Sequence, residues 1–156
     1  MFLDRFFNTS LMMCILAVSR FAADNPFAGT WKLNPAKSKL TGSPMGTSAT
    51  VKTEADADSL KVTVEAANAD GSPNNFNYQA TLDGKPTKVD GSSMIDTITL
   101  KRVNDHTISA TGSKAGKQVY SDRRVISKDG KTMTITRSGT NGQGKKYRAT
   151  LAFDKQ

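Results

Sequence analysis

The sequence predicts an all-β protein, an antiparallel up-and-down β-barrel of about 8–10 strands without a helical lid. Three observations support this fold class. The chain has seventeen Thr between residues 30 and 150 and few Glu, a composition that favours strands over helices. Turn signals such as Asp70-Gly71 and Asp129-Gly130 recur about every 13–14 residues. Between the turns, apolar and polar residues alternate with the period of a strand that is buried on one face.

The first 23 residues are expected to precede the folded domain. A short charged start, an apolar run at residues 11–18 and small residues at 17–19 form the layout of a secretory signal peptide. A second possible cleavage point lies at residues 22–23. We therefore expect a signal peptide at 1–23, a single domain at 24–156, and a secreted or periplasmic protein. Cys14 is the only Cys, so the domain is expected to hold no disulfide; lipid attachment to Cys14 is left open.

The first half of the domain supplies five expected strands. Apolar residues alternate with polar ones from Leu60 to Ala66, and again from Phe76 to Leu82. A polar connection at residues 34–46, rich in Pro, Lys, Ser and Gly, follows the first strand. The strands expected in this half are 29–34, 47–55, 59–67, 74–82 and 85–89.

The second half supplies five more, with the same alternation around Met133 and Ile135 and from Tyr147 to Phe153. Because nearly every connection is a tight turn, successive strands are expected to pair as neighbours. Closing such a sheet into a barrel removes its unpaired edges, and a sandwich is the alternative. The strands expected here are 94–103, 106–112, 117–126, 131–138 and 145–154.

The first expected strand carries a motif, because residues 27–33 read Phe-Ala-Gly-Thr-Trp-Lys-Leu. A Gly-x-Trp that opens an up-and-down barrel resembles the calycin superfamily of lipocalins, fatty-acid-binding proteins and avidins. The full run looks most like the fatty-acid-binding branch. The resemblance implies that Trp31 lies at the closed end of a lipocalin-like barrel, against a basic residue of the last strand. We expect that residue to be Arg148, with Lys146 as the fallback, its cation held over the indole ring.

The sequence departs from the fatty-acid-binding proteins in two places. The connection at 34–46 is too short for their helix-turn-helix lid, and residues 146–148 read Lys-Tyr-Arg where they have a carboxylate-holding Arg-x-Tyr pair. The chain also resembles a set of small secreted bacterial proteins. Their mature part opens with a similar Gly-Thr-Trp-Lys-Leu-Asn run followed by a Lys-Ser-Lys segment, here residues 37–39. That second resemblance implies no particular activity.

Few residues support catalysis or metal binding. With one His and one Cys, the chain has little from which to build a zinc site or a His–Cys catalytic pair. His106 falls in an expected turn, where we expect it to be solvated. Asp56 and Asp58 have the spacing of part of a calcium loop, but the rest of that loop is missing. We therefore expect no enzymatic activity, no metal and no cofactor.

Charge is distributed unevenly along the chain. Residues 24–100 carry 7 basic and 9 acidic residues, whereas residues 101–156 carry 13 basic and 4 acidic residues. A solvated face is one interpretation of this excess. The others are an anionic small ligand and an anionic surface of the cell envelope. Nucleic acid is not expected, because aromatic residues are not interleaved with the basic ones as a stacking platform requires.

The candidate ligand-binding residues are arginines that share a strand face with apolar residues. Arg102, Arg124 and Arg137 have this position, and an Arg that points into a barrel can hold a carboxylate or phosphate. The alternative is an Arg at the rim, with its stem on apolar surface and its head in water. Tyr78 and Tyr120, also on expected inward faces, complete the candidate set.

Together these patterns predict a secreted, monomeric, non-enzymatic barrel that binds a small hydrophobic or amphipathic ligand, neutral or anionic, in its lumen. The alternative is an envelope module that binds another protein, for example a protease inhibitor, and that has a basic face. No run of 18 apolar residues is present, so no transmembrane segment is expected.

Overall fold

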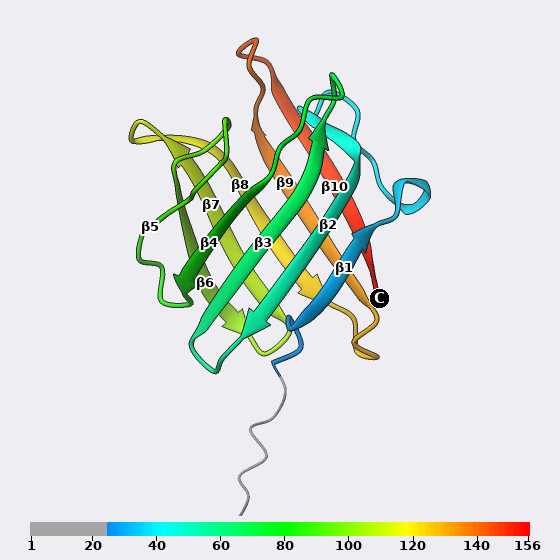
Figure 1. Ribbon diagram of the computed structural model, residues 1–156, viewed down its shortest axis with the longest axis vertical. Helices are drawn as coiled ribbons and strands as arrows, with labels where there is room; N and C mark the ends of the chain where they lie inside the picture. Colours follow the sequence, from blue (N-terminus) through cyan, green and yellow to red (C-terminus); the bar gives the residue numbers. More distant parts are fainter. Residues whose placement is uncertain (1–24) are drawn as a thin grey trace, which may run out of the picture.

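The computed structural model describes residues 25–156, so the expected signal peptide and Cys14 lie outside the described residues. The described part consists of β-strands and one short 3-10 turn (Figure 1). The elements are β1 (Gly29–Leu33), η1 (Pro35–Lys37), β2 (Met45–Ala55), β3 (Ser59–Asn68), β4 (Phe76–Thr81), β5 (Thr87–Lys88), β6 (Thr97–Asn104), β7 (Thr107–Lys114), β8 (Lys117–Ile126), β9 (Thr132–Thr140) and β10 (Lys146–Lys155).

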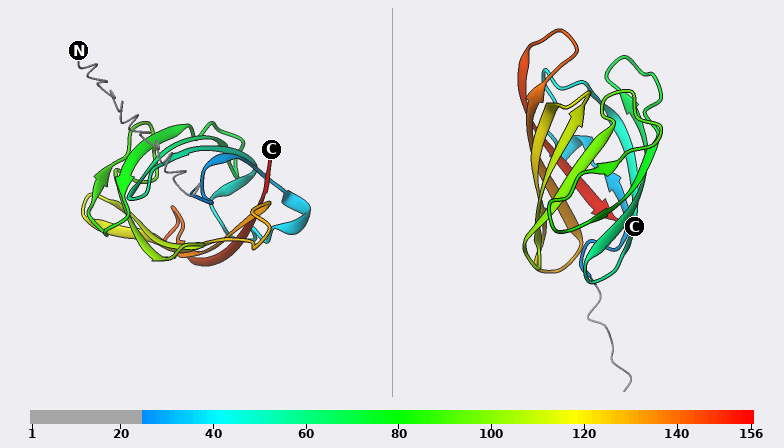
Figure 2. Two further views of the ribbon diagram at one scale, coloured as in Figure 1. Left: turned by 90° about the horizontal axis from the view of Figure 1, so that it is seen from below. Right: turned by 90° about the vertical axis from the view of Figure 1, so that its left-hand side faces the viewer.

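All ten strands belong to one antiparallel sheet in the order β4-β3-β2-β1-β10-β9-β8-β7-β6-β5. The sheet curls until its two edges meet, and it forms a nearly closed ring when seen along the strands (Figure 2, left). Asn77 of β4 and Asp90, just after β5, exchange two backbone hydrogen bonds of 2.9 Å. A further bridge joins Asp83 to Lys101. The sequence-based prediction of an up-and-down barrel is therefore confirmed.

The strands also occur where the alternation of apolar residues predicted them, with ends that differ by a few residues. The largest shift is at β6, which begins three residues later than expected, and β5 keeps only two of its five expected residues. The connection after β1 holds only the 3-10 turn η1, and no helical lid is present within residues 25–156. Within residues 25–156, no helix is long and apolar enough to cross a bilayer.

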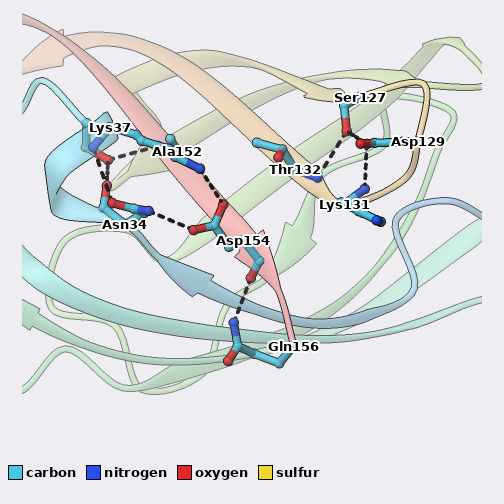
Figure 3. A network of polar contacts seen from close by, with 10 residues as sticks. Asn34, Lys37, Ser127, Asp129, Lys131, Thr132, Ala152, Asp154 and Gln156 are labelled. Carbon is cyan, nitrogen blue, oxygen red and sulfur yellow. Dashed lines mark hydrogen bonds and ion pairs between the residues drawn. The ribbon is translucent and has the colours of Figure 1, made fainter.

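A polar network fastens the connection after β1 to the outer face of β10 (Figure 3). The Nδ2 of Asn34 donates to Oδ2 of Asp154 at 2.7 Å, and Lys37 Nζ lies 3.3 Å from the other carboxylate oxygen. The Ser38 hydroxyl donates to the Asn34 carbonyl and accepts from the amide of Ala152. The hydrogen bond from Asn34, followed by Lys37, lowers the pKa of Asp154. These contacts hold the connection against the barrel wall.

Trp31 closes one end of the barrel. Its side chain has no exposed surface, and its indole Nε1 donates to the carbonyl of Phe27 at 3.0 Å. The ammonium of Lys155 lies 5.4 Å from the ring centroid, within the range of a cation–π contact. Gly29 makes room for the Lys155 side chain, because a Cβ at Gly29 would lie 2.7 Å from Lys155 Cε. The φ of Gly29 is +129°. The Gly-x-Trp motif thus lets the Lys155 stem cross β1.

The expected partner of Trp31, Arg148, is corrected by this arrangement. The inward residues of β10 are the odd-numbered ones, Tyr147 to Phe153, so Arg148 points outward and is exposed. Trp31 is paired with Lys155 in the register of β1 and β10, and Arg148 lies seven residues before Lys155, roughly 23 Å along an extended strand. Lys146 is exposed as well and lies still farther away.

Candidate functional site

The barrel encloses a narrow cavity that is mostly apolar. Its walls come from the inward-facing residues of β2, β3, β4, β8, β9 and β10, with Phe27 and Phe153 toward the Trp31 end. The cavity volume is about 80 Å³, room for a handful of water molecules. Within residues 25–156, Arg124 and Arg137 are the only charged side chains that line it. They therefore define the candidate site.

Strand register brings these two arginines to one carboxylate. Asp122 and Arg124 lie two residues apart on β8, so their side chains share the inward face. Arg137 of β9 is the direct cross-strand partner of Asp122. The Asp122 side chain has no exposed surface, and the side chains of Arg124 and Arg137 are each 10% exposed. We call Asp122, Arg124 and Arg137 the buried trio.

Both oxygens of Asp122 are used within the buried trio. Oδ1 accepts a hydrogen bond from Nε of Arg124 at 3.0 Å. Oδ2 accepts two from Arg137, from Nε at 3.1 Å and from Nη2 at 2.7 Å. Asp122 itself does not line the cavity, whereas both arginines do. The carboxylate therefore lies behind the guanidiniums and holds them in place at the cavity wall.

Aromatic and sulfur contacts fix the guanidiniums further. Arg124 Nη1 donates to the hydroxyl of Tyr78 on β4 at 2.9 Å, a contact across the lumen between strands that are not neighbours in the sheet. The Arg137 guanidinium carbon lies 3.8 Å from the ring centroid of Tyr120, and Arg137 Nη1 lies 3.3 Å from the sulfur of Met45. Both arginines are thus held in single orientations before any ligand arrives.

Burial and charge set the ionisation of the cluster. Burial alone would raise the pKa of Asp122, but Arg124 and Arg137 outweigh it and hold that pKa below its usual value. Burial lowers the pKa of Arg124, but Asp122 together with Tyr78 and Tyr120 outweighs burial and raises that pKa, so both partners stay charged. Burial raises the pKa of Tyr120 to about 12 and also raises the pKa of Tyr147. The buried trio therefore carries two positive charges and one negative charge, and the two phenols beside it are neutral.

Two glycines provide the space for Tyr120. Its ring lies against Gly112 of β7, where a Cβ would be 2.5 Å from the ring carbon Cζ. Gly139 of β9 is the cross-strand partner of both Tyr120 and Tyr147, and a Cβ there would lie 2.9 Å from the Tyr147 hydroxyl. A larger residue at either position would displace the ring on which Arg137 rests.

Several polar groups at the site have no partner in the described part of the chain. The Tyr147 hydroxyl and Oδ1 of Asn74 are buried without a hydrogen bond. Arg124 Nη2 donates to no described residue, and the only contact of Arg137 Nη1 is the weak one to Met45 sulfur. The lumen-facing edges of the guanidiniums are therefore available to an acceptor.

An open depression lies at the end of the barrel opposite Trp31, among connections that are uppermost in Figure 1, and it shares Met94 with the cavity. The depression has a volume of about 700 Å³ and lies among the connections before β2, after β3 and between β9 and β10. Met94 lines both the depression and the cavity, and half-buried Met45 lies over Arg137. Methionine side chains adapt easily, so these two form a deformable entrance.

Four of the five expected ligand-binding residues meet in this site: Tyr78, Tyr120, Arg124 and Arg137. Arg102 does not, and its assignment is corrected. It is exposed near the other end of the barrel, where its Nη2 donates to the carbonyl of Ala57 at 2.7 Å. A shift in the pairing of β6 with β7 after Arg102 ends the regular alternation there.

Three participants were missed by the sequence reasoning: Asp122, Met45 and Tyr147. Asp122 had a detectable signal, an acidic residue on an apolar stripe two positions from an Arg. Met45 precedes the strand expected there, and Tyr147 was assigned only to the core. Among residues 25–156, no group of three or more His, Cys, Asp or Glu side chains is arranged to hold a metal ion.

Comparisons with known proteins agree with the fold. No protein-family model and no curated sequence matches the chain. Among solved structures, it is similar to zebrafish ileal bile acid-binding protein complexed with cholic acid, with a TM-score of 0.53 and 12% identity. The match covers 84% of this chain and 99% of that chain. The chain therefore has the fatty-acid-binding-protein-like calycin fold, as the first-strand motif predicted.

Proposed function

We propose that this chain is a non-enzymatic binding protein that holds a small amphipathic ligand in its lumen, with the ligand's acidic group on Arg124 and Arg137. One observation carries the proposal. Two charged guanidiniums, held rigidly and with unused donors, face a cavity whose other walls are uncharged and mostly apolar. An apolar pocket with a few fixed polar groups is the usual form of a small-molecule site.

The physical chemistry favours a ligand with an acidic head and a slender apolar body. Guanidinium–carboxylate hydrogen bonds are among the stronger ones in proteins and fix orientation. The apolar body gains roughly 25 cal/mol for each Å² that it removes from water. Because the cavity volume is only about 80 Å³, the ligand must displace side chains, and Met45 and Met94 are the adaptable ones. A narrow alkyl or isoprenoid chain therefore suits the lumen better than a broad ring system.

The fold supports the proposal. The zebrafish protein of the same fold is complexed with cholic acid, which is a small amphipathic acid. That likeness is one of fold, and the residues that would hold the acid are those of this chain's own buried trio.

We also propose that residues 1–23 direct export, so that the ligand is met outside the cytoplasm. The intact mass of the full chain, purified from the periplasmic fraction of a bacterial host, tests this. The expected mass lacks a segment that ends near residues 19–23. A full-length mass in the cytoplasmic fraction would contradict export without affecting the binding proposal.

Titration calorimetry with ligands of equal chain length tests the binding proposal. Decanoate is expected to bind at least tenfold more tightly than decanol, because only decanoate has an acceptor for the guanidiniums. Replacement of Arg124 by Met is expected to remove that difference. The matched control is Arg123→Met, since Arg123 is the chain neighbour of Arg124 but is exposed on the outer face of β8. Equal binding of decanol and decanoate, or an equal loss in both variants, would overturn the proposal.

The outer surface favours a second candidate function, attachment to an anionic surface of the envelope. Eleven of the thirteen Lys and Arg side chains in residues 101–156 are exposed, and Arg123 and Arg148 lie on the outer faces of β8 and β10. A clustered positive face attracts anionic polymers and headgroups with a strong dependence on salt. Retention on anionic vesicles that falls in Arg123→Glu/Arg148→Glu would support this function; equal retention by neutral vesicles would contradict it.

A further inference from the structure

We propose that the buried trio makes the lumen selective for ligands with one negative charge, such as carboxylates and sulfonates, over ligands with two, such as phosphate monoesters. The selectivity-determining residue is Asp122, which reduces the charge of the arginine pair from two to one. This inference rests on the proposed function and adds to it the chemical class of the ligand's head group.

The charge count follows from the contacts of the buried trio. Asp122 is fully buried and bonded through both oxygens to Arg124 and Arg137. No other charged side chain within residues 25–156 lines the cavity. The lumen therefore carries one uncompensated positive charge when it is empty of ligand.

The titratable groups that face the buried trio do not change this count. They are the phenols of Tyr78, which accepts from Arg124, of Tyr120, which lies under Arg137, and of Tyr147, the cross-strand partner of Gly139. Burial raises the pKa of Tyr120 to about 12 and raises the pKa of Tyr147 as well.

The position of Asp122 determines which groups of the buried trio a ligand can contact. Because both guanidiniums line the cavity and the carboxylate does not, an anion in the lumen contacts the guanidiniums and adds to the buried trio without replacing Asp122. Arg124 Nη2 and Arg137 Nη1 are the donors left for it. A carboxylate or sulfonate offers the two oxygens that such a pair of donors needs.

The energetic argument is one of charge balance in an apolar lumen. Uncompensated charge that is cut off from water is costly, and the cost falls when an opposite charge is added. A monoanionic ligand brings the net charge of the buried trio plus ligand to zero. A dianion leaves one uncompensated negative charge, and a neutral ligand leaves one positive charge. Affinity is therefore expected to be highest for a single negative charge.

Two decyl ligands with oxyanion heads test this inference. Decanesulfonate is a monoanion at every pH used, whereas decyl phosphate changes from mainly monoanion at about pH 5 to dianion at about pH 8 because its second pKa is about 6. By titration calorimetry, the affinity of decanesulfonate is expected to be the same within about twofold at both pH values. The affinity of decyl phosphate is expected to fall at least tenfold at about pH 8.

A variant links the effect to Asp122. In Asp122→Asn the lumen carries two positive charges, so the dianion of decyl phosphate is expected to bind more tightly than decanesulfonate at about pH 8. The control Asp105→Asn changes the net charge equally but at an exposed turn, and it is expected to keep the wild-type preference. Circular dichroism checks that both variants fold; if Asp122→Asn does not fold, the two wild-type titrations decide the matter alone.

The outcomes separate the inference from the proposed function. Binding of both ligands with no preference, or with a preference for the dianion in the wild type, would overturn monoanion selectivity and leave the lumen site standing. If no decyl compound binds at either pH, the proposed function fails and the inference fails with it.

Discussion

Asp122 of β8 lies directly opposite Arg137 of β9, and its carboxylate accepts two hydrogen bonds from that guanidinium, at 3.1 and 2.7 Å. The pair lies inside the barrel, where an unpartnered charge is costly. This relationship connects the fold to the proposed function, because the same pairing that keeps charge in the core holds two arginines at the cavity wall.

Replacement of Asp122 by Ala is expected to lower the free energy of unfolding by about 3–5 kcal/mol. The reason is that two guanidiniums then remain buried without their counter-charge. Urea denaturation of the variant measures the effect. Asp105→Ala, at an exposed turn, is the control and is expected to cost less than about 0.5 kcal/mol. A similar small cost for Asp122→Ala would mean that the trio is not buried as described.

Stability is expected to fall with acidification through the pKa of Asp122. Because Arg124 and Arg137 hold that pKa below its value in the unfolded chain, the unfolded state binds the proton first, and the stabilisation present above about pH 4 is lost at lower pH. Measured by urea denaturation at a series of pH values, the wild type should lose more stability below about pH 4 than Asp122→Asn does. Parallel curves for the two proteins would contradict an ionised Asp122.

Trp31→Ala is expected to lower the free energy of unfolding by roughly 3–5 kcal/mol, since it empties the closed end of the barrel. Lys155→Met should cost about 0.5–1 kcal/mol through the lost cation–π contact. Arg148→Met should have almost no effect, because Arg148 is exposed on the outer face. The midpoint of thermal unfolding ranks the three variants, and a larger loss in Arg148→Met than in Lys155→Met would reverse the assignment.

The two tyrosine hydroxyls at the site are expected to respond differently to removal. Tyr78→Phe deletes the acceptor for Arg124 Nη1 and should cost about 1.5–3 kcal/mol, the usual value for a hydrogen bond to a charged group. Tyr147→Phe removes a buried hydroxyl that has no partner among residues 25–156, so it should be neutral or slightly stabilising. Urea denaturation distinguishes the two, and equal costs would show that Tyr147 is hydrogen-bonded in solution.

Local patterns in the sequence were sufficient to predict the barrel, because period-two alternation and turn residues depend only on near neighbours in the chain. They also placed Arg124 and Arg137 on inward faces. Arg148 was misassigned as the partner of Trp31, since the resemblance placed a basic residue on the last strand but not the register of that strand against β1. Arg102 was misassigned because alternation gives the face of a residue but not its depth in the barrel: Arg102 is still in register with Ile108, but it lies near the end of β6 and is exposed.

The part of the site that sequence reasoning missed depends on pairing between strands. That Asp122 lies between two arginines follows only from the register of β8 with β9, and the Tyr78–Arg124 contact joins strands that are not neighbours in the sheet. The two glycines beside Tyr120 also depend on strand pairing. The space that a side chain would need is taken by the Tyr120 ring at Gly112, and by the Val119 carbonyl, Tyr120 and Tyr147 at Gly139.

The protonation of a bound ligand tests the central claim most directly. Decanoate labelled with ¹³C at its carboxyl carbon reports its own ionisation by NMR, free and bound, as the pH is lowered. If the head group lies on Arg124 and Arg137, the bound carboxyl must titrate below the free one, because two guanidiniums favour its charged form. A bound carboxyl that titrates above the free one would place the head group in an apolar region without cations, and would contradict the account.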